Sequence, residues 1–199
     1  MVISNEHIGL DLIQSLANKR DILRREGVNK QLLFKALKIN QAPNPSLIWD
    51  TTAGLGEDIC WFLAMGAQVI ASERNPLTYA LISYHIQKLK EQGEKVELLW
   101  GSAPELFEKL SAQNFHAIYF DPFYQKKRKA KAKKSMELIG GAFHDDDLDA
   151  ELIAQKLFDH CQSRFVIKRA DKAPVLIHSI KPTYEIKGKT IRFDIYYRG

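Results

Sequence analysis

Cysteine is scarce in this 199-residue sequence, and long apolar runs are missing. The two cysteines, Cys60 and Cys161, lie in apolar segments without a CxxC or His/Cys spacing, so we expect buried reduced thiols rather than a disulfide or a metal site. No apolar stretch approaches the ~20 residues that cross a bilayer, which argues against a membrane protein. The first residues lack the basic start, apolar middle and cleavage site of a secretory signal. We therefore expect a cytoplasmic protein.

Acidic residues are absent from the segment Lys126–Lys134 (KKRKAKAKK), which carries seven basic residues. The rest of the chain has 22 basic and 24 acidic residues, so the net charge of +5 is a local property of this segment. A concentrated basic segment favours a polyanionic partner such as nucleic acid, because neutralising phosphates releases counterions. A solvated surface loop is the open alternative. The expected RNA-binding residues here are Lys126, Lys127, Arg128, Lys129, Lys131, Lys133 and Lys134.

The order of the apolar segments predicts an α/β fold. Within residues 1–45 two groups with helical spacing, Ile8–Leu16 and Leu32–Leu37, predict an N-terminal helical extension. Residues 46–199 are interpreted as one compact Rossmann-like domain, a size at which a single core is usual. Short runs rich in β-formers predict strands at Leu47–Trp49, Gln68–Ser72, Val96–Leu99, Ala117–Phe120 and Phe165–Lys168.

Helical stretches separate these strands, which predicts a mostly parallel sheet covered on both faces. After Pro174, the segments Ile177–Ile186 and Thr190–Tyr197 are strand-like and are joined by Lys187-Gly188-Lys189. They predict a C-terminal antiparallel hairpin. Parallel βα units followed by such a hairpin resemble the seven-stranded sheet of Rossmann-like class I methyltransferases, although the chain order does not fix the strand order.

A glycine-containing loop follows the first predicted strand. The strand ends at Asp50, the loop contains Gly54 and Gly56, and a helix begins near Asp58. Glycine permits positive φ angles and close approach of a ligand to the backbone. The second strand ends at Glu73, 23 residues after Asp50, near the ~20-residue offset at which an acid grips ribose hydroxyls. This context predicts a cofactor that contains adenosine, with Glu73 as its ribose ligand.

The residues beside the loop narrow the type of cofactor. Dinucleotide sites place a third Gly or Ala where this chain has Ile59, and the carboxylates of Glu57 and Asp58 would repel a pyrophosphate. The same carboxylates suit S-adenosylmethionine, which carries an ammonium and a sulfonium and no phosphate; they also suit a helix N-terminus, and both interpretations can hold. The expected cofactor residues are Asp50, Thr52, Gly54, Gly56, Asp58, Glu73, Arg74, Ser102 and Asp121.

The fourth predicted strand leads into Asp121-Pro122-Phe123-Tyr124, at the edge where parallel sheets bind ligands. This segment resembles the Asp/Asn-Pro-Pro-aromatic motif of methyltransferases that modify exocyclic amines. Asp121 can accept hydrogen bonds from an NH2 group and aim its lone pair, while an aromatic face stacks on an extruded base. We therefore expect these four residues to be catalytic. A β-turn with two core aromatics is the structural alternative.

Two further segments carry charge near this edge. Lys168 and Arg169, at the end of the fifth strand, are expected on the side of Asp121, where they could hold an RNA phosphate or form surface salt bridges. The stretch Gly140–Asp147 contains a histidine and three aspartates, but acids before an amphipathic helix more often cap it than bind metal. No metal site is expected.

These segments together resemble the family of ribosomal RNA small subunit (guanine-N2)-methyltransferase J, over nearly all the sequence after about residue 20. The resemblance is carried by Asp50–Asp58, Glu73–Pro76, Asp121–Tyr124, the end of the basic run, the Gly-Gly and acidic stretch, Val166–Arg169 with Ala173-Pro174, and Arg192–Ile195. The family is similar in replacing the first loop glycine at the position of Thr52. It differs in usually having Met-Phe-Pro where this chain has Phe123-Tyr124-Gln125.

The resemblance implies methyl transfer from S-adenosylmethionine to the N2 amine of a guanosine in small-subunit rRNA, free or in the assembled subunit. Asp121 would be the amine acceptor, Glu73 the ribose ligand, and Gly54 and Gly56 the cofactor loop. Alternatives that share these residues are an amine methyltransferase of tRNA or DNA and a non-catalytic RNA-binding protein of the same fold. An NAD-dependent oxidoreductase is disfavoured by Ile59 and by the absence of a Tyr-x-x-x-Lys pair near the ligand edge.

Overall fold

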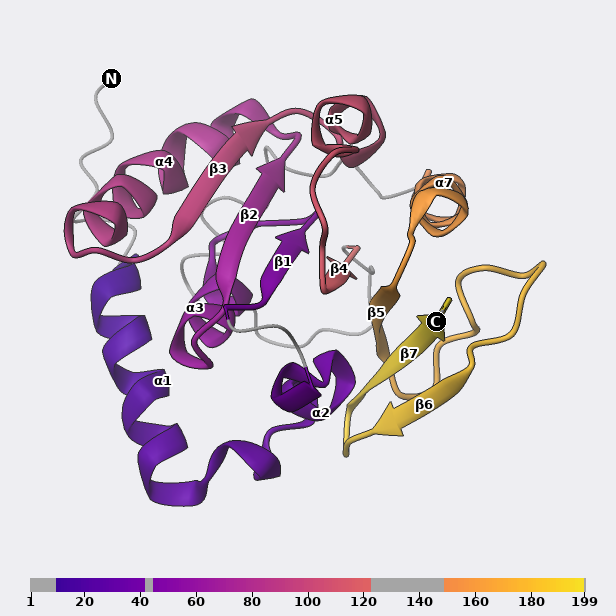
Figure 1. The fold of residues 1–199 in the computed structure, drawn as a ribbon, viewed down its shortest axis with the longest axis horizontal. Coiled ribbons are helices and arrows are strands. Elements are labelled where there is room, and N and C mark those ends of the chain that lie inside the picture. The colour runs from indigo at the N-terminus through magenta and orange to yellow at the C-terminus, as the bar shows by residue number, and fades with distance from the viewer. Residues whose placement is uncertain (1–9, 42–44, 123–148, 199) are drawn as a thin grey trace, which may run out of the picture.

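A computed structural model describes residues 10–41, 45–122 and 149–198 (Figure 1). Its centre is a seven-stranded sheet of order β3-β2-β1-β4-β5-β7-β6, in which β7 runs antiparallel to its neighbours and the other pairings are parallel. The strands are β1 (Leu47–Asp50), β2 (Gln68–Glu73), β3 (Val96–Trp100), β4 (Ala117–Phe120), β5 (Arg164–Ala170), β6 (Tyr184–Lys187) and β7 (Ile191–Tyr197). The mostly parallel sheet expected from the sequence is confirmed.

Helices cover both faces of the sheet. They are α1 (Leu12–Glu26), α2 (Leu32–Leu37), α3 (Glu57–Ala64), α4 (Pro76–Glu91), α5 (Ala103–Leu110) and α7 (Ala150–His160), with short 3-10 turns η2 (Val28–Lys30) and η3 (Ile39–Gln41). One apolar cluster joins α1, α2, α3 and α4 to one face, and a second joins α5 and α7 to the other. The result is a three-layer α/β/α arrangement.

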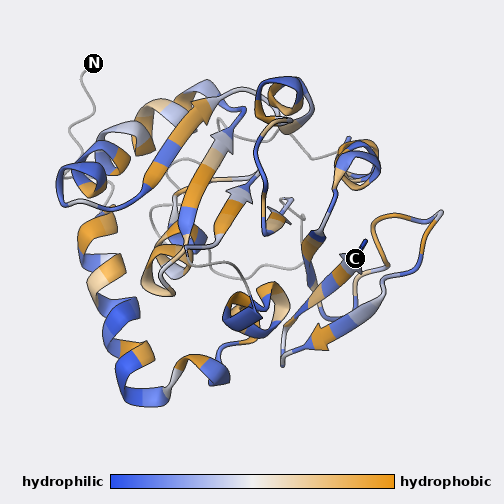
Figure 2. Cartoon of the chain, viewed as in Figure 1, coloured by the Kyte–Doolittle hydropathy of each residue, from blue (hydrophilic) through white to orange (hydrophobic). Residues whose placement is uncertain are grey.

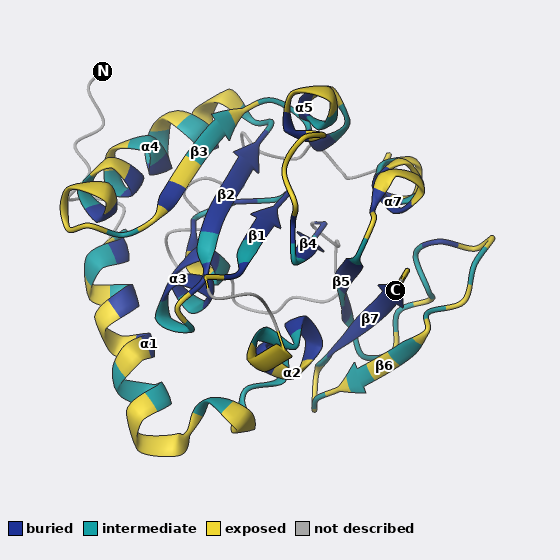
Figure 3. Ribbon diagram, viewed as in Figure 1, coloured by how far each residue is buried: buried dark blue, intermediate teal, exposed yellow. Residues whose placement is uncertain are grey.

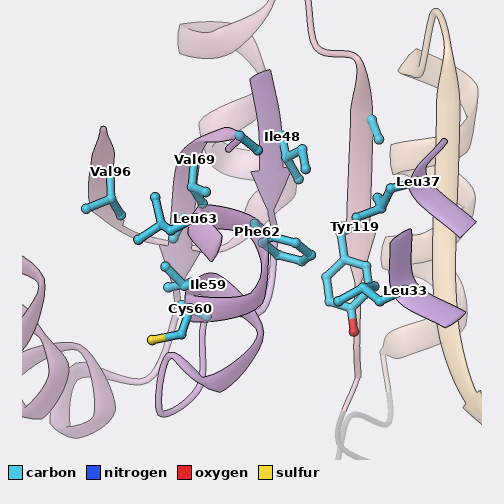
Figure 4. Close-up of a cluster of buried hydrophobic side chains, with 14 of the residues drawn as sticks. Leu33, Leu37, Ile48, Ile59, Cys60, Phe62, Leu63, Val69, Val96 and Tyr119 are labelled. Carbon is cyan, nitrogen blue, oxygen red and sulfur yellow. The ribbon is translucent and has the colours of Figure 1, made fainter. Parts of the chain in front are cut away.

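Strand residues alternate between the two clusters, as the period of two requires. Ile48 and Tyr119 pack in the cluster with α3, whereas Trp49 and Phe120 pack with α5 and α7. Figure 2 shows the hydrophobic character of the central strands, and Figure 3 shows that these strands are buried. In Figure 4 the Tyr119 ring lies in the core near Phe62, where the two rings meet edge to face with centroids 5.1 Å apart.

The helix boundaries follow from capping residues. Asp11 accepts a hydrogen bond from the Gln14 amide at the start of α1, and Gly27, with φ of 82°, follows its last residue. Asn75 accepts from the amides of Leu77 and Thr78 at the start of α4. Both N-terminal helices contribute to the core of the sheet domain, because Leu12, Leu16, Leu33, Ala36 and Leu37 belong to the same cluster as Ile48 and Val166.

One predicted element differs from the structure. The strand expected at Ile177–Ile186 begins only at Tyr184, and the preceding residues are irregular. Pro182 lies within that stretch and has no backbone N–H to give to a ladder, which limits the strand to the residues after it. The hairpin itself is confirmed, with Gly188, Lys189 and Thr190 between β6 and β7.

Candidate active site

The site lies where the chain reverses its direction of travel across the sheet. β1 pairs with β2 on one side and with β4 on the other, so the path from β1 to β3 and the path from β4 to β5 diverge between β1 and β4. Ligands of open α/β sheets bind at such a point, beyond the carboxyl ends of the strands. Asp50, which pairs in register with Tyr119, ends β1 at this point, and Asp121 directly follows β4.

Two glycines shape the loop after β1. Gly54 has φ of +50° and Gly56 has φ of +79°, backbone conformations that side chains disfavour. A Cβ on Gly56 would lie 2.8 Å from the Cδ1 atom of Leu12, so helix α1 fills the space behind the loop. At Gly54 the nearest atom to such a Cβ is the carbonyl oxygen of Thr52, at 3.9 Å. The expected need for glycine in the loop is therefore confirmed at both positions.

Glu73 fastens this loop to the end of β2. Its Oε2 accepts a hydrogen bond from the Gly54 amide at 2.9 Å, and its Oε1 accepts from the Asn75 amide at 2.7 Å. Burial raises the pKa of Glu73, while the amides of Asn75, Gly54 and Arg74 and the Arg74 charge act in the opposite direction. A carboxylate has about four lone-pair positions, so these three bonds leave acceptor capacity beside the glycine loop. Its role as a ribose ligand stays a prediction.

A cluster of charged side chains lies next to the loop. The Lys168 ammonium is 2.9 Å from Asp58 Oδ2 and 2.8 Å from Asp121 Oδ2. The Tyr119 hydroxyl donates to the same Oδ2 of Asp58 at 2.6 Å. Burial lowers the pKa of Lys168, but the Asp121 and Asp58 carboxylates outweigh it and raise the pKa above its usual value. Burial and the Asp58 carboxylate both raise the pKa of Tyr119. Lys168 is therefore a cation and Tyr119 a neutral donor.

Asp50 is the most deeply buried acid of the site, at 1% exposed. Its Oδ1 accepts from the Thr52 amide at 3.1 Å, and its Oδ2 has no hydrogen-bond partner within the part of the chain that the structure describes. Burial, followed by the nearby Asp58 carboxylate, raises the pKa of Asp50 well above its usual value. A buried carboxyl oxygen without a partner indicates a place for a ligand group.

Two threonines connect the β1 loop to the end of β4. The Thr51 hydroxyl donates to the Tyr119 carbonyl oxygen at 2.7 Å, and the Thr52 hydroxyl accepts from the Asp121 amide at 2.8 Å. Because Thr52 stands where the usual methyltransferase loop has glycine, its side chain gives this chain a direct contact between the cofactor loop and Asp121. The sequence identified Thr52 only through the family resemblance, without this contact.

Arg74 and Ser102 follow β2 and β3 at the same edge of the sheet. The Arg74 guanidinium pairs with Asp149 Oδ2 at 2.7 Å, next to the start of α7. Ser102 precedes α5, and its amide donates to Glu105 Oε2 at 3.0 Å. Both residues are thus near the expected cofactor edge, and their contacts with a cofactor stay predictions.

Several expected site residues lie outside the described ranges. They are Phe123, Tyr124, the basic residues of Lys126–Lys134, and the Gly140–Asp147 stretch. Pro122 is described and is buried directly after Asp121.

Lys168 and Arg169, expected to hold an RNA phosphate or to form salt bridges, make different contacts in the structure. Lys168 is on the side of Asp121, as expected, but its ammonium is placed between two carboxylates. The Arg169 side chain points to the other face of β5, is 6% exposed, and donates to the Pro174 carbonyl oxygen at 3.1 Å. A guanidinium buried in this way is poorly placed for an RNA phosphate. Alternation along a strand puts neighbouring residues on opposite faces, so the two side chains have different surroundings. The salt-bridge alternative describes Lys168, and RNA contacts of either residue stay a prediction.

Tyr119 and the pairing of Lys168 with Asp58 were missed from the sequence. A tyrosine two residues before Asp121 on β4 shares its face, which is a usable signal. The Lys168–Asp121 pair depends on the register of β4 and β5, in which Phe120 is opposite Ile167, and a sequence does not fix a parallel register.

The donor set fits a cationic cofactor. Asp50, Asp58 and Asp121 place three carboxyl groups around one ammonium, so the site has an acidic surplus that suits a sulfonium and an ammonium. The Asp50 oxygen that lacks a hydrogen-bond partner among the described residues, and the space beside Gly54, agree with this.

Within residues 10–41, 45–122 and 149–198, no group of three or more His, Cys, Asp or Glu side chains could hold a metal ion. None of the described helices is long and apolar enough to cross a membrane.

Comparison with known proteins identifies the class of enzyme. Residues 3–198 match the family model described as "Putative SAM-dependent methyltransferase". Ribosomal RNA small subunit methyltransferase J of Stutzerimonas stutzeri is 34% identical over 177 residues, covering 85% of this chain and 67% of the relative. The protein of the same name from Cellvibrio japonicus is 33% identical over 195 residues, covering 89% and 71%.

Solved structures agree on the fold. A SAM-dependent methyltransferase from Neisseria gonorrhoeae has a TM-score of 0.64 at 24% identity and covers 85% of this chain and 71% of its own. A methylase from Haemophilus influenzae has a TM-score of 0.54 at 17% identity, with coverage of 86% and 88%. Because the family model spans almost the whole chain, the protein belongs to the S-adenosylmethionine-dependent methyltransferase family that includes ribosomal RNA small subunit methyltransferase J.

Proposed function

We propose that this enzyme transfers the methyl group of S-adenosylmethionine to the exocyclic N2 amine of a guanosine in small-subunit (16S) rRNA. The observation that carries the proposal is the position of Asp121, which follows β4 beside the acidic cluster and is tied to the cofactor loop through Thr52. The relatives named for small-subunit rRNA methylation support this choice of substrate. Such an enzyme would work in the cytoplasm, where ribosomal RNA is matured.

The cofactor would lie across the carboxyl ends of β1 and β2. Glu73 would accept from the ribose hydroxyls, and the acidic surplus of Asp50 and Asp58 would balance the positive groups. Gly54 would let the cofactor approach the backbone. Bound there, S-adenosylmethionine supplies an electrophilic methyl group on sulfur. Thr52, Gly56, Arg74 and Ser102 would complete the binding edge.

Asp121 would orient the acceptor. Its carboxylate accepts hydrogen bonds from the guanine NH2 group and directs the nitrogen lone pair toward the methyl carbon. S-adenosylmethionine would supply the methyl carbon and keep the carbon–sulfur bonding electrons, and Asp121 would hold the amine until its proton is lost to solvent. Phe123 or Tyr124 would stack on the extruded base. Positioning, rather than strong base catalysis, would supply most of the rate.

The basic run Lys126–Lys134 would contact RNA phosphates. The N-terminal segment 1–45 would act as a helical extension of the catalytic domain 46–199, and helix α1 already supports the cofactor loop through Leu12. The proposed partner is rRNA or the small ribosomal subunit. The proposed reaction involves neither a metal ion nor a membrane.

The test is transfer of a radiolabelled methyl group to purified RNAs. We expect incorporation into small-subunit rRNA or subunits that lack the modification, and about 100-fold less with Asp121→Ala. Incorporation into tRNA or DNA alone would favour the alternative amine methyltransferases. Tight RNA binding without transfer would favour the non-catalytic alternative. Calorimetry with S-adenosylmethionine and with NAD tests the cofactor separately.

A further inference from the structure

Lys168 contacts both halves of the site. It comes from β5, its ammonium is 2.9 Å from Asp58 at the start of the cofactor helix α3, and it is 2.8 Å from Asp121 of the acceptor segment. The contact with Asp58 is supported by Tyr119, whose hydroxyl donates to the same carboxylate oxygen. The ammonium forms an ion pair with both carboxylates, so it is a charged link between Asp58 and Asp121.

The surroundings make this link strong. The Lys168 side chain is 24% exposed and that of Asp58 is 21% exposed, which places the pair in a less screened environment than a surface ion pair. The ammonium is paired with Asp58 from α3 and with Asp121, which follows β4. Asp50 from β1 interacts with it electrostatically, and Tyr119 of β4 donates to Asp58. Three acids against one base leave Lys168 as the group that keeps the carboxylates close together.

The first turn of α3 is held from the opposite side as well. Glu57, the neighbour of Asp58, accepts from the Lys19 ammonium at 2.7 Å, and Lys19 comes from α1. Lys19 links the first turn of α3 to α1, and Lys168 links the same turn to the sheet. The Lys168 ammonium also contacts the acceptor residue Asp121.

We propose that Lys168 is a positioning residue for methyl transfer, which sets the position of the Asp121 carboxylate relative to the cofactor helix. The proposal rests on the proposed function, since it assigns Lys168 a task in that reaction. Lys168 touches neither the methyl group nor the amine in this role; it acts through Asp58 and Asp121. The role differs from the RNA contact expected from the sequence, because the ammonium is engaged inside the site.

The charge of Lys168 has a consequence for pH. A cation within 3 Å of a carboxylate favours the ionised form, so removing Lys168 beside two other acids makes ionisation of Asp121 less favourable. A protonated Asp121 loses acceptor capacity toward an NH2 group. As the pH is lowered, a variant without Lys168 should therefore begin to lose activity at a higher pH than the wild type does.

The experiment compares Lys168→Met, Lys168→Arg and the exposed control Lys172→Met in methyl transfer to the RNA that the wild type modifies. We expect Lys168→Met to lower kcat by about 100-fold, with the KM for RNA close to that of the wild type. The acid limb of its pH profile should move to higher pH. Lys168→Arg should restore the acid limb while recovering only part of kcat, because the guanidinium has a different shape. Lys172→Met should behave as the wild type.

A second uncharged variant keeps the proposal testable if Lys168→Met does not fold. If Lys168→Met does not fold by circular dichroism, Lys168→Gln keeps a hydrogen-bond donor without the charge and should show the same shift of the acid limb. A wild-type kcat and pH profile for the folded uncharged variant would overturn the proposal. A variant that raises only the KM for RNA would also overturn it, because that result would indicate that Lys168 contacts an RNA phosphate. Failure of the proposed function is distinct, because then the wild type itself would not methylate the RNA.

Discussion

The hydroxyl of Tyr119 donates a hydrogen bond to the Asp58 carboxylate at 2.6 Å, across the boundary between the sheet and the cofactor helix. Tyr119 is 1% exposed and its ring packs against Phe62, so the hydroxyl is held in place by the core. A core strand thereby fixes an acid of the site.

Tyr119→Phe should weaken the site without disturbing the fold. The change keeps the ring and removes one hydrogen bond to a charged group, which costs about 1.5 to 3 kcal/mol of unfolding free energy. We expect weaker S-adenosylmethionine binding as well, because Asp58 loses an orienting donor. Urea unfolding and calorimetry measure the two effects. Tyr84→Phe, at an exposed tyrosine, is the control, and equal stability of both variants would contradict the prediction.

Gly56→Ala should destabilise the protein more than a glycine change that only strains the backbone. Its Cβ would meet Leu12 at 2.8 Å, and overpacking costs about 1 to 3 kcal/mol in addition to the positive φ. Gly66 has a φ of +85°, and a Cβ added there would have no atom within 4 Å. Gly66→Ala should therefore show only the conformational cost of about 1 to 2 kcal/mol. Thermal or urea unfolding compares them.

The clash itself can be tested with a second substitution. Leu12→Ala is itself destabilising because Leu12 is fully buried, but in the double variant the two losses should sum to less than their separate values, since the atoms that the new Cβ meets are gone. Additive losses in the double variant would show that Leu12 does not set the need for glycine at position 56.

Asp50→Asn should change how stability depends on pH. Burial raises the pKa of Asp50, so the folded protein binds this proton more tightly than the unfolded chain, whose aspartates titrate near ~3.9. The stability that Asp50 contributes is present in full below the unfolded pKa and is lost as pH rises through the folded pKa. Asp50→Asn removes this loss, so its stability should fall less with rising pH. Urea unfolding at several pH values measures the slopes.

The same acid should respond to a cationic cofactor. Positive charge favours the ionised carboxyl, so binding of S-adenosylmethionine below neutrality should release a proton from Asp50. Calorimetry in buffers of different ionisation enthalpy measures that release. Asp50→Asn should bind the cofactor more weakly and release less; an unchanged release would assign the proton to another group.

Arg169→Ala tests whether this residue has a structural role or contacts RNA. Removing the buried guanidinium leaves the Pro174 carbonyl without its donor, at a cost of about 1 to 3 kcal/mol in unfolding free energy. The affinity for RNA and its salt dependence should stay as in the wild type. Lys172→Ala, at an exposed lysine in the following turn, should change stability little. A stable Arg169→Ala protein with weakened RNA binding would restore the original interpretation.

Much of the fold was predictable because the strands are short apolar runs with polar ends. β4 was placed at its observed bounds, and β1 and β2 each extend one residue further, to Asp50 and Glu73, whose polar side chains do not register as strand formers. The early strand at Ile177 was wrong because apolar content was weighed above Pro182. Strand order and register depend on contacts between distant segments, which local patterns do not contain.

The site residues were predictable where their role depends on the local backbone path or on the spacing between neighbouring strand ends. The glycines at 54 and 56 follow from the backbone path, and the placement of Glu73 beside Gly54 follows from the spacing between two strand ends. The Lys168 bridge was not predictable, because it needs residues from α3, β4 and β5 at once. Its charges are separated by up to 110 positions in the chain.

The most direct measurement is mass mapping of small-subunit rRNA from cells that lack this protein, complemented with the wild type or with Asp121→Ala. The proposed function predicts that one guanosine loses a methyl group at its base, that the wild type restores the methyl group, and that Asp121→Ala does not. An unchanged set of guanosine methyl groups in the deletion strain, or full restoration by Asp121→Ala, would contradict it.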